Sequence, residues 1–185
     1  KSGIPVVLVD PHRSVGSTPQ LIRTIADAVG KPDAGEALVK RTQEQIDQAK
    51  KQIAAWKPAK PMRVAFLYVR GNAGVFFILG SENGASELIQ GVGADDVASD
   101  KGITTLVPAN AESLVSINPD AIFVMRDGLA STGGMKGLLA RAGVANTTAG
   151  RKQRVISIPD GISLSFGPQT GEVLTAVAKA LYGVK

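Results

Sequence analysis

A tyrosine and an arginine lie near the end of the apolar strand predicted over residues 62–69. Alternate residues of a strand point to one face, so Tyr68 and Arg70 are predicted to be neighbours. A phenol, whose ordinary pKa is about 10, must lose its proton to bind ferric iron, and a nearby guanidinium favours the charged phenolate. Tyrosinate is a known axial ligand of haem iron. The competing interpretation is a phenol that packs beside an arginine stem.

Other polar positions have weaker chemical patterns. The turn Gly71–Gly74 is rich in glycine, but it lacks the spacing of a phosphate-binding loop and is predicted to be a tight connection. His12 follows a predicted strand and could bind a metal, although a single loop histidine is usually solvated. Ser163, Ser165 and Thr170 lack the pattern of a nucleophile elbow and are predicted to be loop and cap residues.

Composition excludes several kinds of function. The 185 residues contain no cysteine, which excludes disulfides and thiolate metal sites. They contain one histidine, which makes a Ser-His-Asp triad an unfavourable interpretation. No apolar run approaches the roughly 20 residues that span a bilayer. The formal net charge is +5, but aromatic residues make up only 4% and the basic residues are dispersed, which disfavours a nucleic-acid partner.

The apolar spacing predicts alternating strands and helices, and hence an α/β fold with a parallel-type sheet between helices. The helix predicted over Asp33–Trp56 would be roughly 35 Å long, which suits a helix that crosses between two lobes. The apolar segment Ile4–Val9 is predicted to be a buried strand, typical of an α/β fold in mid-course, so we expect the later part of a longer protein. The other expected strands are Met62–Val69, Val75–Leu79, Thr104–Val107, Ala121–Met125 and Arg154–Ile158, and the other expected helices are Thr18–Val29, Ser81–Val92, Ala111–Ile117, Gly134–Ala142 and Pro168–Tyr182.

Several segments resemble one family of transport proteins. The long helix over residues 33–56 and the segment Glu112–Val124, with its Asn-Pro-Asp, are similar to substrate-binding proteins of iron-chelate and cobalamin importers. Four further segments resemble the haem-binding proteins of bacterial haem ABC importers, the HmuT family, in its corynebacterial type. They are Leu67–Gly71, Met125–Leu129, Gly133–Leu139 and Phe166–Thr170.

This resemblance implies the second lobe of a two-lobed, class III type periplasmic-binding-protein fold. Residues 1–32 would be the tail end of the first lobe (a strand and a helix), residues 33–57 the interlobe helix, and residues 58–185 the C-terminal α/β lobe. Haem (iron protoporphyrin IX) would be the transported ligand, with Tyr68 holding the iron and Arg70 beside it. The candidate residues of the haem pocket are Met125, Arg126 and Phe166, with Phe76 and Phe77 as further candidate walls. Glu112 matches the position of the family that docks to the permease.

The resemblance also implies features beyond these residues. The family's first-lobe histidine ligand would lie upstream of Lys1, His12 does not match it, and a pocket tyrosine expected near Thr105 is missing. The implied protein is a non-enzymatic carrier, extracytoplasmic and lipid-anchored, that delivers haem to an ABC permease. Cell-surface haem-binding proteins are additional candidate partners. A ferric-siderophore or cobalamin carrier and an α/β enzyme subunit remain the alternatives.

Overall fold

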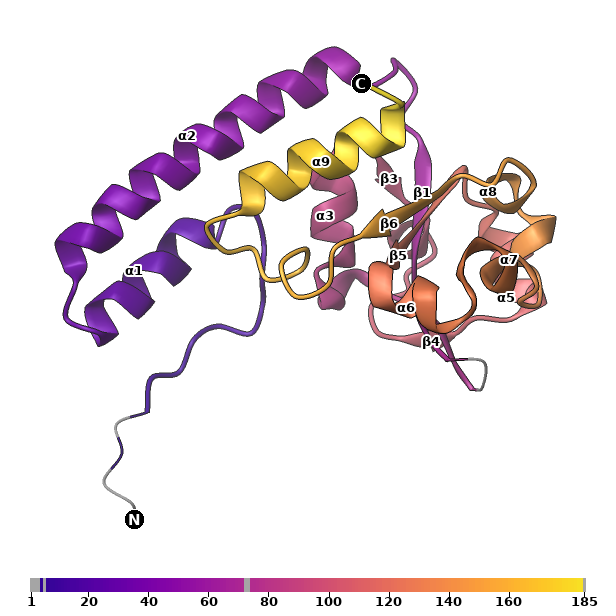
Figure 1. Ribbon diagram of the computed structural model, residues 1–185, viewed down its shortest axis with the longest axis horizontal. Coiled ribbons are helices and arrows are strands. Elements are labelled where there is room, and N and C mark those ends of the chain that lie inside the picture. The colour runs from indigo at the N-terminus through magenta and orange to yellow at the C-terminus, as the bar shows by residue number, and fades with distance from the viewer. Residues whose placement is uncertain (1–3, 5, 72–73, 185) are drawn as a thin grey trace.

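A mixed β-sheet lies between two layers of helices in the structure, a computed structural model that describes residues 4, 6–71 and 74–184 (Figure 1). The strands are β1 (Arg63–Arg70), β2 (Val75–Ile78), β3 (Asp95–Asp96), β4 (Val107–Pro108), β5 (Ala121–Met125) and β6 (Val155–Ile158). The α-helices are α1 (Thr18–Ala28), α2 (Pro32–Trp56), α3 (Ala85–Gly91), α4 (Val97–Asp100), α5 (Ala111–Ile117), α6 (Arg126–Ser131), α7 (Gly134–Leu139), α8 (Thr148–Arg151) and α9 (Thr170–Tyr182). Two short 3-10 helices are η1 (Ser81–Asn83) and η2 (Val144–Asn146).

The strand order is β4-β2-β1-β5-β6, with β3 also paired to β1. Strands β3, β5 and β6 extend the sheet in parallel from β1, as predicted. The prediction of a parallel-type sheet is wrong for β2, which pairs antiparallel with both β1 and β4. The connection from Arg70 to Val75 is too short for a parallel crossover, which needs about a dozen residues. It is therefore the predicted tight turn, of which residues 72 and 73 lie outside the described part.

The alternation of β1 separates two hydrophobic cores. Val64 and Phe66 face a core shared with α3, α9 and the C-terminal half of α2. Ala65, Leu67 and Val69 face the opposite core, which is closed by α4, α5, α7 and α8. Because both faces are covered, the centre of the sheet is buried, and the exposed parts of β1 and β5 are their ends.

The Asn-Pro-Asp segment connects α5 to β5 through several hydrogen bonds. The Arg63 guanidinium donates to the carbonyls of Ile117 at 2.7 Å and Asn118 at 3.1 Å, which satisfies the last carbonyls of α5. Asn118 has a left-handed backbone (φ 36°), and its side-chain oxygen accepts from the Thr148 amide at 2.8 Å. The Asp120 carboxylate accepts from the Arg63 amide at 3.1 Å. This motif therefore holds α5, β1, β5 and α8 in one arrangement.

Helices α1 and α2 form an antiparallel pair to one side of the sheet (Figure 1). Helix α2 begins and ends within one residue of the predicted Asp33–Trp56 span, and its later part packs along α9. Arg23 on α1 and Glu36 on α2 join the pair through hydrogen bonds of 2.6 and 3.1 Å. None of the helices in the described ranges is both long enough and apolar enough to cross a bilayer.

The prediction of a strand over Ile4–Val9 is wrong for the residues of this segment that the structure describes. Pro5 is not among the described residues. Residues 4 and 6–9 have no strand structure, and their side chains are 37–88% exposed. The strands of the described sheet all lie at residue 63 or later, so no strand pairs with this segment and its backbone hydrogen bonds are left to solvent.

Smaller corrections concern the lengths of elements. The predicted helix Ser81–Val92 is divided by Gly84 into η1 and α3. Of the strand predicted over Thr104–Val107, only Val107 is in a strand, as the first residue of β4. The structure adds α6, which follows β5 without a loop.

Candidate functional site

Four side chains form a row across the carboxyl end of the sheet, on the face of β1 that carries Phe66. Tyr68 pairs with Phe77 on β2, and directly opposed residues of antiparallel strands share a face. Leu67 on β1 pairs with Val124 on β5. The next residues of these two parallel strands, Tyr68 and Met125, therefore lie side by side. Met125 in turn pairs with Ile158 on β6. Phe77, Tyr68 and Met125 are half-buried, so the row ends in a partly open apolar surface.

The guanidinium of Arg70 lies against the phenol ring of Tyr68. Its Cζ atom is 5.4 Å from the ring centroid, within the range of a cation–π contact. On its other side, Arg70 Nη2 lies 3.2 Å from Asp160 Oδ1, and Asp160 Oδ2 accepts from the Asp127 amide at 2.9 Å. The predicted neighbourhood of Tyr68 and Arg70 is thus present, with Asp160 as a third member.

The charges of this group influence one another. The Tyr68 hydroxyl and then the Asp160 carboxylate raise the pKa of Arg70. Partial burial on its own would raise the pKa of Asp160, but the Asp127 amide, Arg70 and Arg126 together lower it below its usual value. Asp160 and Arg70 are therefore a charged pair at neutral pH.

Helix α6 approaches the end of β1 very closely. A Cβ atom on Gly128 would lie 2.5 Å from the Val69 carbonyl oxygen and 3.5 Å from Arg70 Nη1, so only glycine allows this packing. From the same helix, the Ser131 hydroxyl accepts from the Gly71 amide at 2.9 Å, just after Arg70. These contacts fix the backbone that carries Arg70.

The other predicted pocket residues lie in different surroundings. Arg126 follows Met125 and is exposed at the start of α6. Phe166 is only 2% exposed, with its ring in the core that contains Phe66. Phe76 belongs to the opposite core, where the Arg141 guanidinium lies 5.3 Å from its ring centroid, so Phe77 is the phenylalanine beside Tyr68.

Glu112 is exposed in the first turn of α5, a helix that contributes no residue to the row formed by Phe77, Tyr68, Met125 and Ile158. Both ends of its short helix are capped. At the start, Asn110 and Ser113 exchange side-chain to backbone hydrogen bonds of 2.8 and 3.0 Å, and at the end Arg63 takes up the carbonyls. The side chain of Glu112 is therefore displayed on a rigid support.

Several of the other candidates have local roles. Ser163, Ser165 and Thr170 donate to nearby carbonyls in the loop before α9, as predicted for loop and cap residues. His12 is exposed on the N-terminal segment, where its Nδ1 lies 3.2 Å from Asp10 Oδ1. Thr105 is exposed in the loop before β4. Within the described ranges, no group of three or more His, Cys, Asp or Glu side chains is arranged to hold a metal ion.

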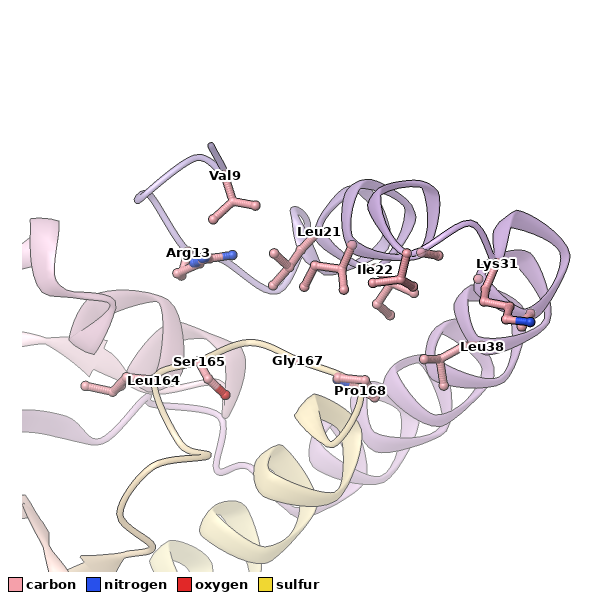
Figure 2. A pocket seen from close by; sticks show the side chains of 15 residues that line it. Val9, Arg13, Leu21, Ile22, Lys31, Leu38, Leu164, Ser165, Gly167 and Pro168 are labelled. Carbon is pink, nitrogen blue, oxygen red and sulfur yellow. The ribbon is translucent and has the colours of Figure 1, made fainter. Parts of the chain in front are cut away.

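A separate apolar groove of about 560 Å³ lies between the helix pair and the loop that leads into α9. Figure 2 shows Leu21 and Ile22 of α1 and Leu38 of α2 on one side of it, with Leu164 and Pro168 on the other. Its charged lining residues are Arg13 and Lys31, and Tyr68, Arg70 and Met125 do not line it. The groove has the character of a packing surface rather than of an iron site.

The sequence favours Phe76 and Phe77 equally as candidate walls, and the register of a hairpin closed at Arg70 and Val75 selects Phe77, because it places Phe77 opposite Tyr68. Sequence reasoning missed one member of the site, Asp160. Asp160 lies in a loop selected by the general rule that ligands bind beyond the carboxyl ends of strands. Its pairing with Arg70, however, depends on the strand order and has no local signal.

The fold and the sequence together define the class of protein. The sequence profile of the periplasmic binding protein family matches residues 1–161, and the chain belongs to this family. No curated protein was found to match the chain.

Several solved structures are similar to this chain. The chain is 47% identical to the protein of a crystal structure described as heme binding protein HmuT, with a TM-score of 0.95. The matched region includes 100% of this chain and 59% of the HmuT chain. Variants of HmuT with a single histidine, tyrosine or arginine changed to alanine also match, and the replaced tyrosine and arginine are two positions apart.

Two more distant structures have the same fold. The periplasmic heme-binding protein RhuT from Roseiflexus sp. RS-1, in its apo form, is 35% identical with a TM-score of 0.86, over 92% of this chain and 64% of that one. The periplasmic heme-binding protein BhuT, in complex with two hemes, is 31% identical with a TM-score of 0.83, over 94% and 64% of the two chains. The chain thus spans about three-fifths of the length of each of these proteins.

Proposed function

We propose that this chain is part of a non-enzymatic haem carrier in which Tyr68, as tyrosinate, holds the iron of the transported haem. The observation that carries the proposal is the half-buried Tyr68 with the Arg70 guanidinium 5.4 Å from its ring centroid, at the open end of the sheet. The same two residue types at the same spacing were replaced in variants of HmuT, a protein 47% identical to this chain.

The surroundings of Tyr68 suit a flat, apolar ligand with two carboxylates. Phe77 and Met125 flank the phenol on the same face, so a porphyrin bound to the Tyr68 oxygen has an aromatic and a thioether side chain to pack on. Arg126 is the exposed cation next to Met125 and is proposed to bind a propionate. Phe166 is proposed to support this surface from within the core.

We propose the following division of the chain. Residues 1–32 form the tail end of a first lobe, residues 33–57 the interlobe helix and residues 58–185 the C-terminal lobe. The apolar groove beneath α1, with Ile25 and Val29 51% and 64% exposed beside it, supports this division because such a surface favours a covering partner.

In this proposal the protein works outside the cytoplasm, as the name of its family implies, and delivers haem to an ABC permease. Glu112 on the capped helix α5 is proposed to dock to arginines of the permease. A lipid anchor in the full-length protein and acceptance of haem from cell-surface haem-binding proteins complete the proposed pathway.

A haemin titration of the full-length protein tests the proposed function. We expect a shifted Soret band and the charge-transfer band of tyrosinate-ligated ferric haem, and we expect Tyr68→Phe to abolish that band and weaken haemin retention. Tyr182→Phe is the matched control, because Tyr182 is the second of the two tyrosines in this sequence. Its hydroxyl donates to the Val92 carbonyl at 2.7 Å, near β3, which pairs with the end of β1 opposite to Tyr68. Unchanged spectra for Tyr68→Phe would falsify the assignment, and binding of a ferric siderophore or cobalamin without haemin would identify a different cargo.

A further inference from the structure

The carboxylate of Asp160 joins two strand ends that are not adjacent in the sheet. Arg70 ends β1, and Asp160 lies two residues beyond the end of β6, whereas β5 lies between these strands. The contact of 3.2 Å between Arg70 Nη2 and Asp160 Oδ1 therefore spans the end of β5. This ion pair ties the arginine of the site to a loop far from it in the sequence.

Asp160 is itself held in one orientation. Its second oxygen accepts from the Asp127 amide at 2.9 Å, so each carboxylate oxygen has a donor from a different element. The side chain of Asp160 is 25% exposed and that of Arg70 is 38% exposed. A partly exposed arginine on a flexible stem would otherwise sample many rotamers.

We infer that Asp160 is a positioning residue that keeps the Arg70 guanidinium against the phenol of Tyr68. The inference deepens the proposed function and rests on it for its functional consequence. The attraction between a guanidinium and a phenolate decreases with distance, so it is useful only while Arg70 stays within a few ångströms of the phenol. Asp160 also occupies one edge of the guanidinium, which leaves Arg70 less able to turn away toward a carboxylate of the ligand.

The first test measures the motion of Arg70 without haemin. In the full-length protein labelled with 15N-arginine, we expect the Nη hydrogens of Arg70 to give separate NMR signals, because rotation of a paired guanidinium is slow. We expect Asp160→Ala to merge these signals and Asp127→Ala, which removes an adjacent carboxylate but keeps the amide, to leave them separate. Asp160→Asn preserves volume and replaces Asp160→Ala if the latter does not fold. Free rotation in the parent, or restricted rotation in the Asp160 variant, would overturn the inference whatever the protein does with haemin.

The second test asks whether Asp160 acts through Arg70. In a double-mutant cycle we expect Asp160→Ala to weaken haemin binding about tenfold in the parent and less than about twofold in an Arg70→Ala background. Equal losses in both backgrounds would show that Asp160 acts independently of Arg70, and tighter binding by Asp160→Ala would also overturn the inference. If the parent does not bind haemin, the proposed function fails, and the NMR measurement alone decides the role of Asp160.

Discussion

At the scale of single residues, the two arginines near Tyr68 have different surroundings. Arg70 contacts the Tyr68 ring and the Asp160 carboxylate, whereas the exposed Arg126 has no ion pair among the residues that the structure describes. A guanidinium that already has a carboxylate partner gains less from a second one than an unpaired guanidinium does. We therefore propose different functions for the two: Arg70 would stabilise the phenolate, and Arg126 would bind the ligand's carboxylate.

This assignment predicts a dependence on the haem propionates. Arg126→Gln should weaken haemin binding about three- to tenfold, the effect of losing one partly exposed charge pair, and should leave the affinity for haemin dimethyl ester unchanged, since the ester lacks the carboxylates. Titrations of both pigments against parent and variant give the comparison. An equal loss of affinity for haemin and its ester would assign another role to Arg126.

Asp160 predicts a pH dependence of stability. The folded-state pKa of this carboxyl is lowered, despite the opposing effect of burial, by the Asp127 amide, Arg70 and Arg126. A lowered pKa stabilises the folded state above the unfolded value of about 3.9, and this contribution is lost as the pH falls through the folded value.

Asp160→Asn should therefore reduce the free energy of unfolding by about 0.5–1 kcal/mol at pH 7, because the pair is partly exposed. The difference from the parent should disappear at an acid pH below the lowered folded-state pKa, where Asp160 is protonated in both the folded and the unfolded state. Urea unfolding at both pH values measures it, with Asp127→Asn as the control for a nearby charge. A difference that persists in acid would show that Asp160 stabilises the fold by something other than its charge.

At the scale of elements, the site depends on how closely α6 packs on β1. Gly128→Ala would place a methyl group 2.5 Å from the Val69 carbonyl oxygen, so the helix must move away from the strand. We expect a loss of about 1–3 kcal/mol in the free energy of unfolding, the usual cost of overpacking, together with weaker haemin binding because Arg126 and the Asp127 amide move with the helix.

Gly16→Ala is a suitable control for this prediction. A Cβ atom at Gly16 would be 3.8 Å from its nearest neighbour, the Ser14 hydroxyl, and its backbone is not left-handed. Its stability should stay within about 0.5 kcal/mol of the parent. Equal stabilities for Gly128→Ala and the parent would show that α6 is not constrained at this position.

Helix α5 gives a second prediction at this scale. Because Asn110, Ser113 and Arg63 already cap α5, removing the exposed Glu112 side chain should change stability by at most about 0.3–1 kcal/mol, the effect of the helix dipole. If Glu112 docks to the permease, Glu112→Ala should weaken that complex and reduce its salt dependence while haemin binding stays the same.

The control is Glu172→Ala, which removes another exposed first-turn glutamate, from α9. Binding of both variants to the purified permease at low and high salt decides the matter. Equal affinities of the Glu112 variant and the parent at low salt would leave Glu112 with a role in its helix alone.

At the scale of the whole molecule, an open apolar groove lies between α1, α2 and the loop that leads into α9 (Figure 2). Since we propose that residues 1–32 belong to a first lobe, and since the chain spans 59% of HmuT, one wall of a haem cleft would come from outside residues 1–185. We expect residues 1–185 alone to bind haemin at least about tenfold more weakly than the full-length protein. Equally tight one-to-one binding by a monomer of residues 1–185 would show that Tyr68 and its neighbours suffice.

Much of this fold could be predicted from local patterns in the sequence. The period of apolar residues identified α2 to within one residue and placed Tyr68 and Arg70 on one face of β1. The motif of residues 118–120 marked the end of α5 and the start of β5, because a left-handed asparagine and a proline stop a helix through purely local geometry. These features depend on residues close together in the chain.

Only the tertiary structure decided which distant residues meet. The apolar segment of residues 4 and 6–9 has the composition of a buried strand, yet it is exposed because burial requires a neighbouring strand that its own sequence cannot supply. Phe76 and Phe77 are chemically identical, and the pairing of β2 with β1 decides that Phe76 enters one core while Phe77 lies half-buried beside Tyr68. Asp160 reaches Arg70, 90 residues earlier, because β5 separates β1 from β6 by a single strand. Strand order is set by long-range packing, so no local pattern in the sequence specifies that contact.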